Sequence, residues 1–246
     1  MSKIAVAGAT GRVGRHVVDV LRERGHDVVP IARAHGVDVI TGEGLADALA
    51  GVETIVDAAS FPSPDQAAAT EFFLTATENL QREGERAGVE RLVVVSIIGA
   101  DRVDSGYIAS KIPHERAALA GPIPARILRA AQFHEFVPQF VDWCRQGDVA
   151  YVPEMRTQLV AARAVAEALA DLTGAGDGPI LEIAGPREES LVAVAELLSA
   201  RRGDPPRVEG VHDPADPEQA AYTSGALLPG PGAILAGPTF EEWLAA

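Results

Sequence analysis

The chain begins with an apolar run that leads into a glycine motif and then into a helical pattern: KIAVAGATGRVGRHVV, residues 3–18. Glycines stand at positions 8, 11 and 14, between a predicted buried strand and a predicted helix that ends at Gly25. Four apolar residues share one face of that helix: Val13, Val17, Val20 and Leu21. A glycine motif in this strand-to-helix position restricts the chain to few architectures.

Strand and helix patterns alternate along the rest of the chain. Strands are predicted at 27–33, 37–42, 54–60, 90–100, 124–130 and 179–185. Helices are predicted at 45–51, 64–88, 133–146, 159–174 and 188–203. Such alternation is typical of a parallel sheet with helices on both faces. We therefore predict an α/β fold with a Rossmann-type doubly wound parallel sheet, formed as a single domain by residues 1–246.

The C-terminal part of the chain differs in composition. Residues 205–246 hold 7 of the 17 prolines, which predicts loops that cover the sheet until FEEWLAA ends the chain. We expect a small substrate cap, mainly within 130–160 and 185–246. The apolar stretch 226–237 is predicted to close over the site as a lid, and its alternative role is a surface loop at a sheet edge.

Charge and cysteine content exclude several classes of protein. Twenty-one basic against 35 acidic residues give a formal net charge of −14, which repels nucleic acid and anionic membrane surfaces. One cysteine excludes an internal disulfide, and we expect a cytoplasmic protein, a monomer or homodimer, that acts on a small molecule. The six histidines show no metal-ligand spacing, so we predict no metal site.

The glycine motif predicts a dinucleotide pocket. Gly8 permits the tight turn, Gly11 lets a pyrophosphate approach the backbone, and Gly14 lets the helix pack closely. The start of a helix offers unpaired N–H groups and partial positive charge to phosphates. We expect the remaining loop residues, Thr10, Arg12 and Val13, to contact the same ligand. A tight turn that binds nothing would need one glycine rather than three.

The end of the second predicted strand indicates which dinucleotide binds. Proteins that bind NAD usually place an acidic residue there, against the ribose 2′-hydroxyl. This chain has Arg33 instead, and Arg33 together with Arg12 can pair with a 2′-phosphate. We therefore favour NADP(H) over NAD(H). The alternative is that either arginine is a solvated surface charge.

The spacing GxxGxxG resembles that of short-chain dehydrogenases/reductases. Later segments extend the resemblance over nearly the whole chain, to the atypical, NmrA-like branch of that superfamily. These segments are ATENLQREGERAGVERLVVVSIIGADR, ILRAAQFHEF, LVAARAVAEALADL, LEIAGP and FEEWLA.

The resemblance implies a catalytic site around YIASK. In the superfamily the tyrosine of a YxxxK pair is the proton donor, and the lysine activates it and holds the nicotinamide ribose, which implies these roles for Tyr107 and Lys111. Ser96, at the end of the preceding strand, would orient the substrate oxygen. Pro113 suits the first turn of a helix, so the helix can also begin near Lys111 and leave Tyr107 on a loop. The alternative is a surface tyrosine beside a helix-capping lysine.

Further candidates follow the carboxyl ends of predicted strands, where α/β sheets bind ligands. The resemblance implies that Ala58, Ala59 and Ser60 run along the adenosine side of the cofactor, while Asp57 is a candidate turn cap. The candidate substrate residues are Phe61, Arg129, Gln132, Phe133 and His134. For His134, a packed residue on a helix face is an equally weighted alternative.

Together these features predict an NADPH-dependent oxidoreductase that reduces a carbonyl or quinone of a small apolar metabolite. Two alternatives stay open. The NmrA-like branch includes redox sensors that bind the dinucleotide without chemistry and act through a protein partner, but such sensors typically lack the Tyr–Lys pair. A nucleotide-sugar epimerase-like isomerase ranks lower, because the C-terminal part is short for a nucleotide-sugar pocket.

Overall fold

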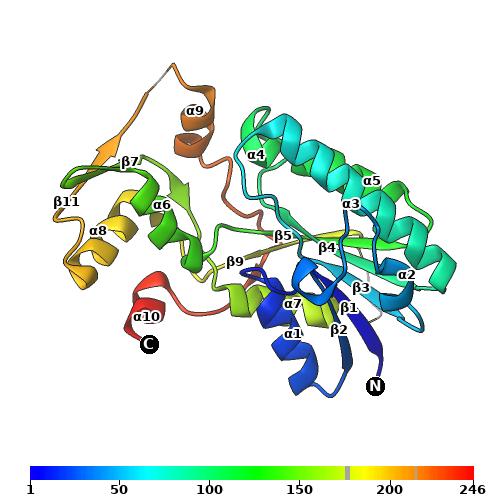
Figure 1. Ribbon diagram of the computed structural model, residues 1–246. Helices are drawn as coiled ribbons and strands as arrows, with labels where there is room; N and C mark the ends of the chain where they lie inside the picture. Colours follow the sequence, from blue (N-terminus) through cyan, green and yellow to red (C-terminus); the bar gives the residue numbers. More distant parts are fainter. Residues whose placement is uncertain (175–177, 214) are drawn as a thin grey trace.

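Seven parallel strands form the main sheet of the computed structural model, which describes residues 1–174, 178–213 and 215–246 (Figure 1). The inner strands are short and rich in buried aliphatic residues, as parallel strands covered on both faces require, whereas both residues of the edge strand 234–235 are exposed. In sheet order they are β12 (Ile234–Leu235), β9 (Ile180–Ala184), β5 (Ala125–Ala130), β4 (Arg91–Ile97), β3 (Thr54–Asp57), β1 (Lys3–Ala7) and β2 (Asp27–Ile31).

Helices cover the main sheet on both faces (Figure 1). One face packs against α1 (Gly14–Glu23) and α7 (Ala162–Leu172). The other face packs against α2 (Leu45–Ala48), α3 (Gln66–Ala87) and α5 (Lys111–Ala120), with the short α4 (Gly106–Ala109) just before α5. Alternate residues of β1 enter the two cores, Ile4 and Val6 on the α1 side and Ala5 and Ala7 on the α3 side. The predicted doubly wound α/β fold is confirmed.

A second, smaller sheet lies beside the main one and has its own hydrophobic core (Figure 1). Its strands are β11 (Arg207–Val211), β7 (Val149–Pro153) and β6 (Arg145–Gln146). Its core is closed by α6 (Val137–Trp143), α8 (Leu191–Arg202) and α10 (Phe240–Ala245). The remaining elements are η1 (Arg33–His35), η2 (His134–Phe136), α9 (Pro217–Ser224) and the antiparallel pair β8 (Arg156–Thr157) and β10 (Glu189–Ser190). We call the second sheet, together with β8, β10, η2, α6, α8, α9 and α10, the cap.

Strand register brings polar residues together at the carboxyl edge of the main sheet. Asp57, the last residue of β3, pairs with Ala7, which directly precedes the glycine motif. Ser96, near the end of β4, pairs with Arg129 of β5. The carboxyl ends of neighbouring parallel strands share one edge, so the sheet alone places these residues on the same edge as the glycine turn.

Two expectations from the sequence are wrong in detail. Residues 37–42 form turns rather than a strand, because the Asp38 carboxylate accepts the N–H of Ile40 at 2.7 Å and competes with strand pairing. The proline-rich C-terminal part is more than loop cover, since β12 extends the main sheet and Phe240 is fully buried in the cap core. Residue 214 of the predicted cap segment 185–246 lies outside the described residues. Among the described residues, no helix has the length and apolar character to cross a membrane.

Candidate active site

Backbone atoms lie so close to the three glycines of the turn that a Cβ atom at any of these positions would crowd a carbonyl oxygen. Gly8 has φ +72°, and a Cβ there would lie 2.6 Å from the carbonyl oxygen of Ala58. A Cβ on Gly14 would lie 2.1 Å from the carbonyl oxygen of Gly8, and one on Gly11 3.1 Å from the same atom. The loop after β3 therefore lies directly against Gly8, and the start of α1 lies against the turn itself.

The start of α1 is open to an anion. Val13 precedes the helix and supplies no side-chain cap, so first-turn N–H groups have no side-chain acceptor at the N-cap. Thr10 lies exposed in the turn. A turn with glycines at its close contacts that leads into an uncapped helix start fits the phosphates of a dinucleotide. The residues present thus suit NAD(P)H.

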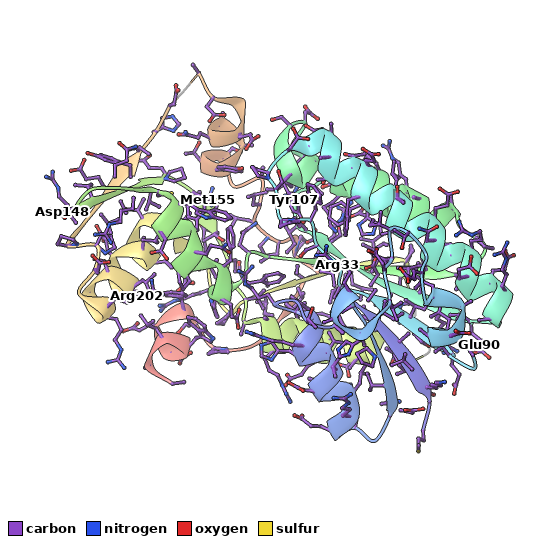
Figure 2. All side chains as sticks on the ribbon, viewed as in Figure 1. Arg33, Glu90, Tyr107, Asp148, Met155 and Arg202 are labelled. Carbon is purple, nitrogen blue, oxygen red and sulfur yellow. The ribbon has the colours of Figure 1, made fainter. Side chains whose placement is uncertain are left out.

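The two candidate phosphate-binding arginines lie in different surroundings. Arg33 is exposed in η1, just past the end of β2, and is labelled in Figure 2. A cavity of about 160 Å³ lies nearby, between α1 and the segment that ends β2, with Arg15 and His35 in its lining. Arg12 instead donates from Nη2 to Oε1 of Gln139 at 2.9 Å and lies over the Phe136 ring, so it contacts the cap.

Tyr107 and Lys111 meet at one aromatic ring, that of Phe73 on α3. The Tyr107 ring approaches it edge-on with centroids 5.9 Å apart, and the Lys111 ammonium lies 3.8 Å from its centroid. In Figure 2, Tyr107 lies between the main sheet with its helices and the cap. Burial raises the pKa of Tyr107, against a smaller lowering from a hydrogen bond with the backbone of Phe61.

The helix break predicted from Pro113 is present. Tyr107 belongs to α4, and α5 begins at Lys111 after the turn residue Ser110. Pro113 has no N–H to donate to the carbonyl of Ala109, which interrupts the hydrogen-bond ladder. The Ser110 backbone stays in the right-handed helical region, so Tyr107 and Lys111 keep a near-helical relation despite the break.

Lys111 is buried and heads a chain of polar contacts. Its Nζ lies 3.0 Å from Nδ1 of His114, and Nε2 of His114 lies 3.3 Å from Oδ2 of Asp57. The His114 ring stacks on Phe73 with centroids 4.7 Å apart. Burial lowers the pKa of Lys111 to about 8, although the charges of Asp57 and Glu115 oppose that shift.

A second buried network surrounds Ser96. Its hydroxyl donates to Oε1 of Glu115 at 2.5 Å, and Arg129 donates to both oxygens of Glu115 at 2.8 Å. Arg129 also donates from Nη1 to Asp101 at 2.7 Å. Ser96 and Arg129, predicted as substrate-facing residues, therefore use their hydrogen-bonding groups on neighbours within the protein.

The other predicted substrate residues divide between the site and the cap. Phe61 lies near Tyr107 and packs against Phe72 with centroids 5.4 Å apart. His134 is fully buried between Phe240 and Trp243, with Nε2 3.0 Å from the carbonyl oxygen of Pro238, so it anchors the C-terminal helix. Gln132 accepts from the Thr157 hydroxyl at 2.8 Å, and Phe133 packs against the main core.

The loop after β3 lies where the sequence predicts. Ala58 and Ala59 contact the Gly8 turn through their backbone, and Ser60 follows them on the surface. Asp57 caps this loop, since its Oδ1 accepts the N–H of Ala59 at 3.0 Å. The same carboxylate also binds His114, a contact that sequence reasoning missed.

Sequence reasoning missed the roles of His114 and Glu115. Both follow Lys111 on α5, three and four positions later, and residues so spaced share one face of a helix. That spacing was the available signal. Nothing in the sequence identifies Asp57 as the partner of His114, since β3 and α5 come together only when the chain folds.

Comparisons with known proteins place this chain among NAD(P)H-binding proteins. A family model described as NAD(P)H-binding matches residues 8–120. L-arabinose 1-dehydrogenase (NAD(P)(+)) of Haloferax volcanii is 34% identical over 105 residues, which cover 39% of this chain and 41% of that protein. A 3-beta-hydroxysteroid dehydrogenase of Mycolicibacterium neoaurum is 33% identical over 114 residues, which cover 38% of this chain and 31% of that protein. The matches thus span less than half the length of either curated relative.

Solved structures resemble the chain over almost its whole length. MoeE5 in complex with UDP-glucose and NAD has a TM-score of 0.72 at 20% identity, covering 99% of this chain and 96% of that one. UDP-N-acetylglucosamine 4-epimerase from Bacillus cereus has a TM-score of 0.71 at 18% identity, covering 99% and 94%. At such identities the likeness shows the fold, which includes the arrangement of sheet and cap.

Proposed function

We propose that this chain, whose residues 8–120 match the NAD(P)H-binding family model, is an NADPH-dependent oxidoreductase that reduces a carbonyl or quinone of a small apolar metabolite. The observation that carries the proposal is the meeting of Tyr107 and Lys111 at Phe73, with Lys111 linked through His114 to Asp57, which precedes the loop that lies against Gly8. A phenol and an ammonium on one ring, at the sheet edge where the cofactor binds, supply the acid that a carbonyl reduction needs. The NmrA-like relationship stays a prediction.

The chain's own residues account for the proton. Bound NADPH supplies hydride chemistry, so the carbonyl carbon gains two electrons and a hydrogen and the oxygen must gain a proton. Tyr107 gives its phenolic proton to that oxygen and regains one from solvent. Burial raises the pKa of the Tyr107 hydroxyl, so the phenol is protonated at neutral pH and its donation depends on a nearby cation that stabilises the phenolate. Lys111, whose pKa is about 8, carries its charge at neutral pH and stabilises the phenolate that donation leaves.

Two of the proposed roles depend on side chains that now have other partners. Ser96 orients a substrate oxygen only when its hydroxyl leaves Glu115. Arg12 reaches a phosphate only when it leaves Gln139. Arg33 is exposed at the end of β2, so the preference for NADPH over NADH rests mainly on this residue. The cap, mainly residues 130–160 and 185–246, is proposed to complete the substrate pocket.

The test is NADPH oxidation by the purified protein, with NADH in parallel, against a panel of quinones, ketones and aldehydes. Turnover with an apolar carbonyl compound or quinone, and faster with NADPH than with NADH, is the expected result. Tight NADPH binding without turnover on any of these would favour a redox sensor. A separate incubation with a UDP-sugar, followed by chromatography, tests the isomerase: conversion of the sugar without net cofactor oxidation would favour it.

A further inference from the structure

Lysine is rare in this chain, and one of its two lysines is buried. The sequence has Lys3 and Lys111 among 21 basic residues, so 19 of them are arginine. Lys3 is partly exposed and donates from Nζ to the carbonyl oxygen of Ala50 at 2.7 Å, whereas Lys111 is 4% exposed. A buried lysine can lose its proton near neutral pH and a buried arginine cannot, so position 111 holds a basic group that can titrate.

In the hydrogen bond between Lys111 and His114, only one assignment of donor and acceptor is possible. An ammonium only donates, so Nδ1 of His114, 3.0 Å away, must accept and carries no proton. The proton of the neutral ring is then on Nε2, which faces Oδ2 of Asp57 at 3.3 Å. Burial, with a further contribution from the Lys111 charge, lowers the pKa of His114 and keeps the ring neutral. The donors therefore run from Lys111 through His114 to Asp57.

Asp57 is fixed at the other end of this chain of contacts. It closes β3, pairs in register with Ala7, and accepts the N–H of Ala59 with its second oxygen. Burial raises the pKa of this carboxyl, but hydrogen bonds from His114 and Ala59 outweigh that effect and lower it. The ionised carboxylate therefore connects the lysine to the loop that lies against Gly8.

We propose that Asp57 and His114 are positioning residues, which hold the Lys111 ammonium on the Phe73 ring and keep it charged. The catalytic consequence rests on the proposed function above, whereas the effect on Lys111 itself does not. The arrangement orients Lys111 through a neutral imidazole as a carboxylate orients a ligand or catalytic histidine in other proteins. Without it, the ammonium would lose an acceptor and a nearby opposite charge inside the core.

The charged groups around Lys111 decide the direction of the effect. Asp57 from β3 and Glu115 from α5 both favour the ammonium, and Glu115 is itself held by Arg129 of β5. From α3, the uncharged Phe73 ring faces it, and Tyr107 of α4 reaches the edge of that ring. Burial lowers the pKa of Lys111, and the charge of Asp57 and the acceptor on His114 counteract that effect. Removing either one leaves the effect of burial less balanced. Either change lowers the pKa of Lys111.

The experiment is an NMR titration of the full chain with lysine isotope-labelled at Cε, which gives two signals. The signal of the partly exposed Lys3 is the internal reference. In the wild type we expect Lys111 to titrate near pH 8. In Asp57→Asn and His114→Leu we expect its midpoint about one unit or more lower. His114→Gln, whose amide can accept from Lys111 and donate to Asp57, should restore the wild-type midpoint to within a few tenths of a unit.

Unchanged Lys111 midpoints in both Asp57→Asn and His114→Leu would overturn the proposal, as would a midpoint in His114→Gln as low as that in His114→Leu. Thermal unfolding and circular dichroism establish that each variant is folded. If Asp57→Asn fails to fold, the comparison of His114→Leu with His114→Gln decides alone. If neither His114 variant folds, their failure against a folded wild type assigns His114 to stability and also overturns the proposal.

The pH profile of turnover separates this proposal from the proposed function. If Lys111 acts with Tyr107, the pH at which kcat falls on the alkaline side moves down together with the NMR midpoint. At pH 8, a midpoint one unit lower reduces the charged fraction of Lys111, and with it the kcat of His114→Leu, by about five-fold. A shifted NMR midpoint without any wild-type turnover would refute the reductase and leave the positioning role standing. Turnover together with an unshifted NMR midpoint would support the reductase and refute the positioning role.

Discussion

The guanidinium of Arg129 binds the carboxylate of Glu115 through two hydrogen bonds, each 2.8 Å long. Both side chains are buried, and Ser96 and Asp101 add one further bond each. The pair joins β5 to α5 at the carboxyl edge of the sheet, so it fixes the helix that carries Lys111. Such a pair is costly to break, because loss of Glu115 leaves the buried Arg129 with only the half-exposed Asp101 as an ionic partner.

We predict that Glu115→Ala destabilises the protein by about 3–5 kcal/mol, because it leaves Arg129 buried without its main partner. Urea unfolding measures the change. Glu23→Ala is the matched control: Glu23 also accepts two N–H groups from one arginine, Arg163, but at an exposed position. We expect little change for Glu23→Ala. Equal losses from the two variants would contradict the stated role of burial.

Replacement of Gly14 tests the glycine turn. A Cβ at position 14 would lie 2.1 Å from the carbonyl oxygen of Gly8, so Gly14→Ala must displace the turn or the helix. We expect the free energy of unfolding to fall by about 1–3 kcal/mol and NADPH to bind more weakly. Nicotinamide fluorescence measures the binding. At Gly232 a Cβ meets nothing within 4 Å, so Gly232→Ala should leave both unchanged. Wild-type NADPH affinity in Gly14→Ala would argue against this turn as the binding site.

The Arg33→Ala variant addresses cofactor preference. Arg33 is exposed at the end of β2, where a 2′-phosphate would gain a charge-assisted hydrogen bond. We predict that the variant raises the Kd for NADPH about ten-fold or more and changes the Kd for NADH less than two-fold. Arg86→Ala, on the surface of α3, should change neither. A parallel rise for both dinucleotides would mean that Arg33 does not read the phosphate.

Stability should depend on pH through Lys111. Its pKa is about 8 in the folded chain and 10.5 when exposed, so the unfolded state binds more protons between these values. Stability therefore rises with pH in that window, relative to a Lys111→Met variant, by on the order of 3 kcal/mol in total. Urea unfolding of both proteins from pH 7 to 10 measures it. A constant difference between them would show that Lys111 titrates normally.

The sequence was enough to predict the sheet and its glycine turn. Periodicity located α1, α3, α7 and the central strands, because their apolar faces are continuous and their ends carry glycine stops such as Gly25 and Gly88. The turn at 37–42 was missed because its apolar residues resemble a strand. The side chain of Asp38 decides the local structure there.

The site was only partly predictable, for a topological reason. Tyr107 and Lys111 are neighbours in the sequence, so a motif can identify them. The contact of His114 with Asp57 joins residues 57 positions apart, and it depends on how α5 packs beside β3. His134 shows the converse: its place after a strand suggested a substrate contact, yet its ring faces α10, because the C-terminal residues return to cover it.

The measurement that tests the central claim most directly is kcat for carbonyl reduction by Tyr107→Phe, beside wild type and Tyr151→Phe. Tyr151 lies on β7 of the cap and serves as the matched control. We predict that Tyr107→Phe loses about 100-fold or more in kcat on ketones and aldehydes, with NADPH binding retained, while Tyr151→Phe stays near wild type. Wild-type turnover of the same substrates by Tyr107→Phe would show that the proton comes from elsewhere and would contradict the account.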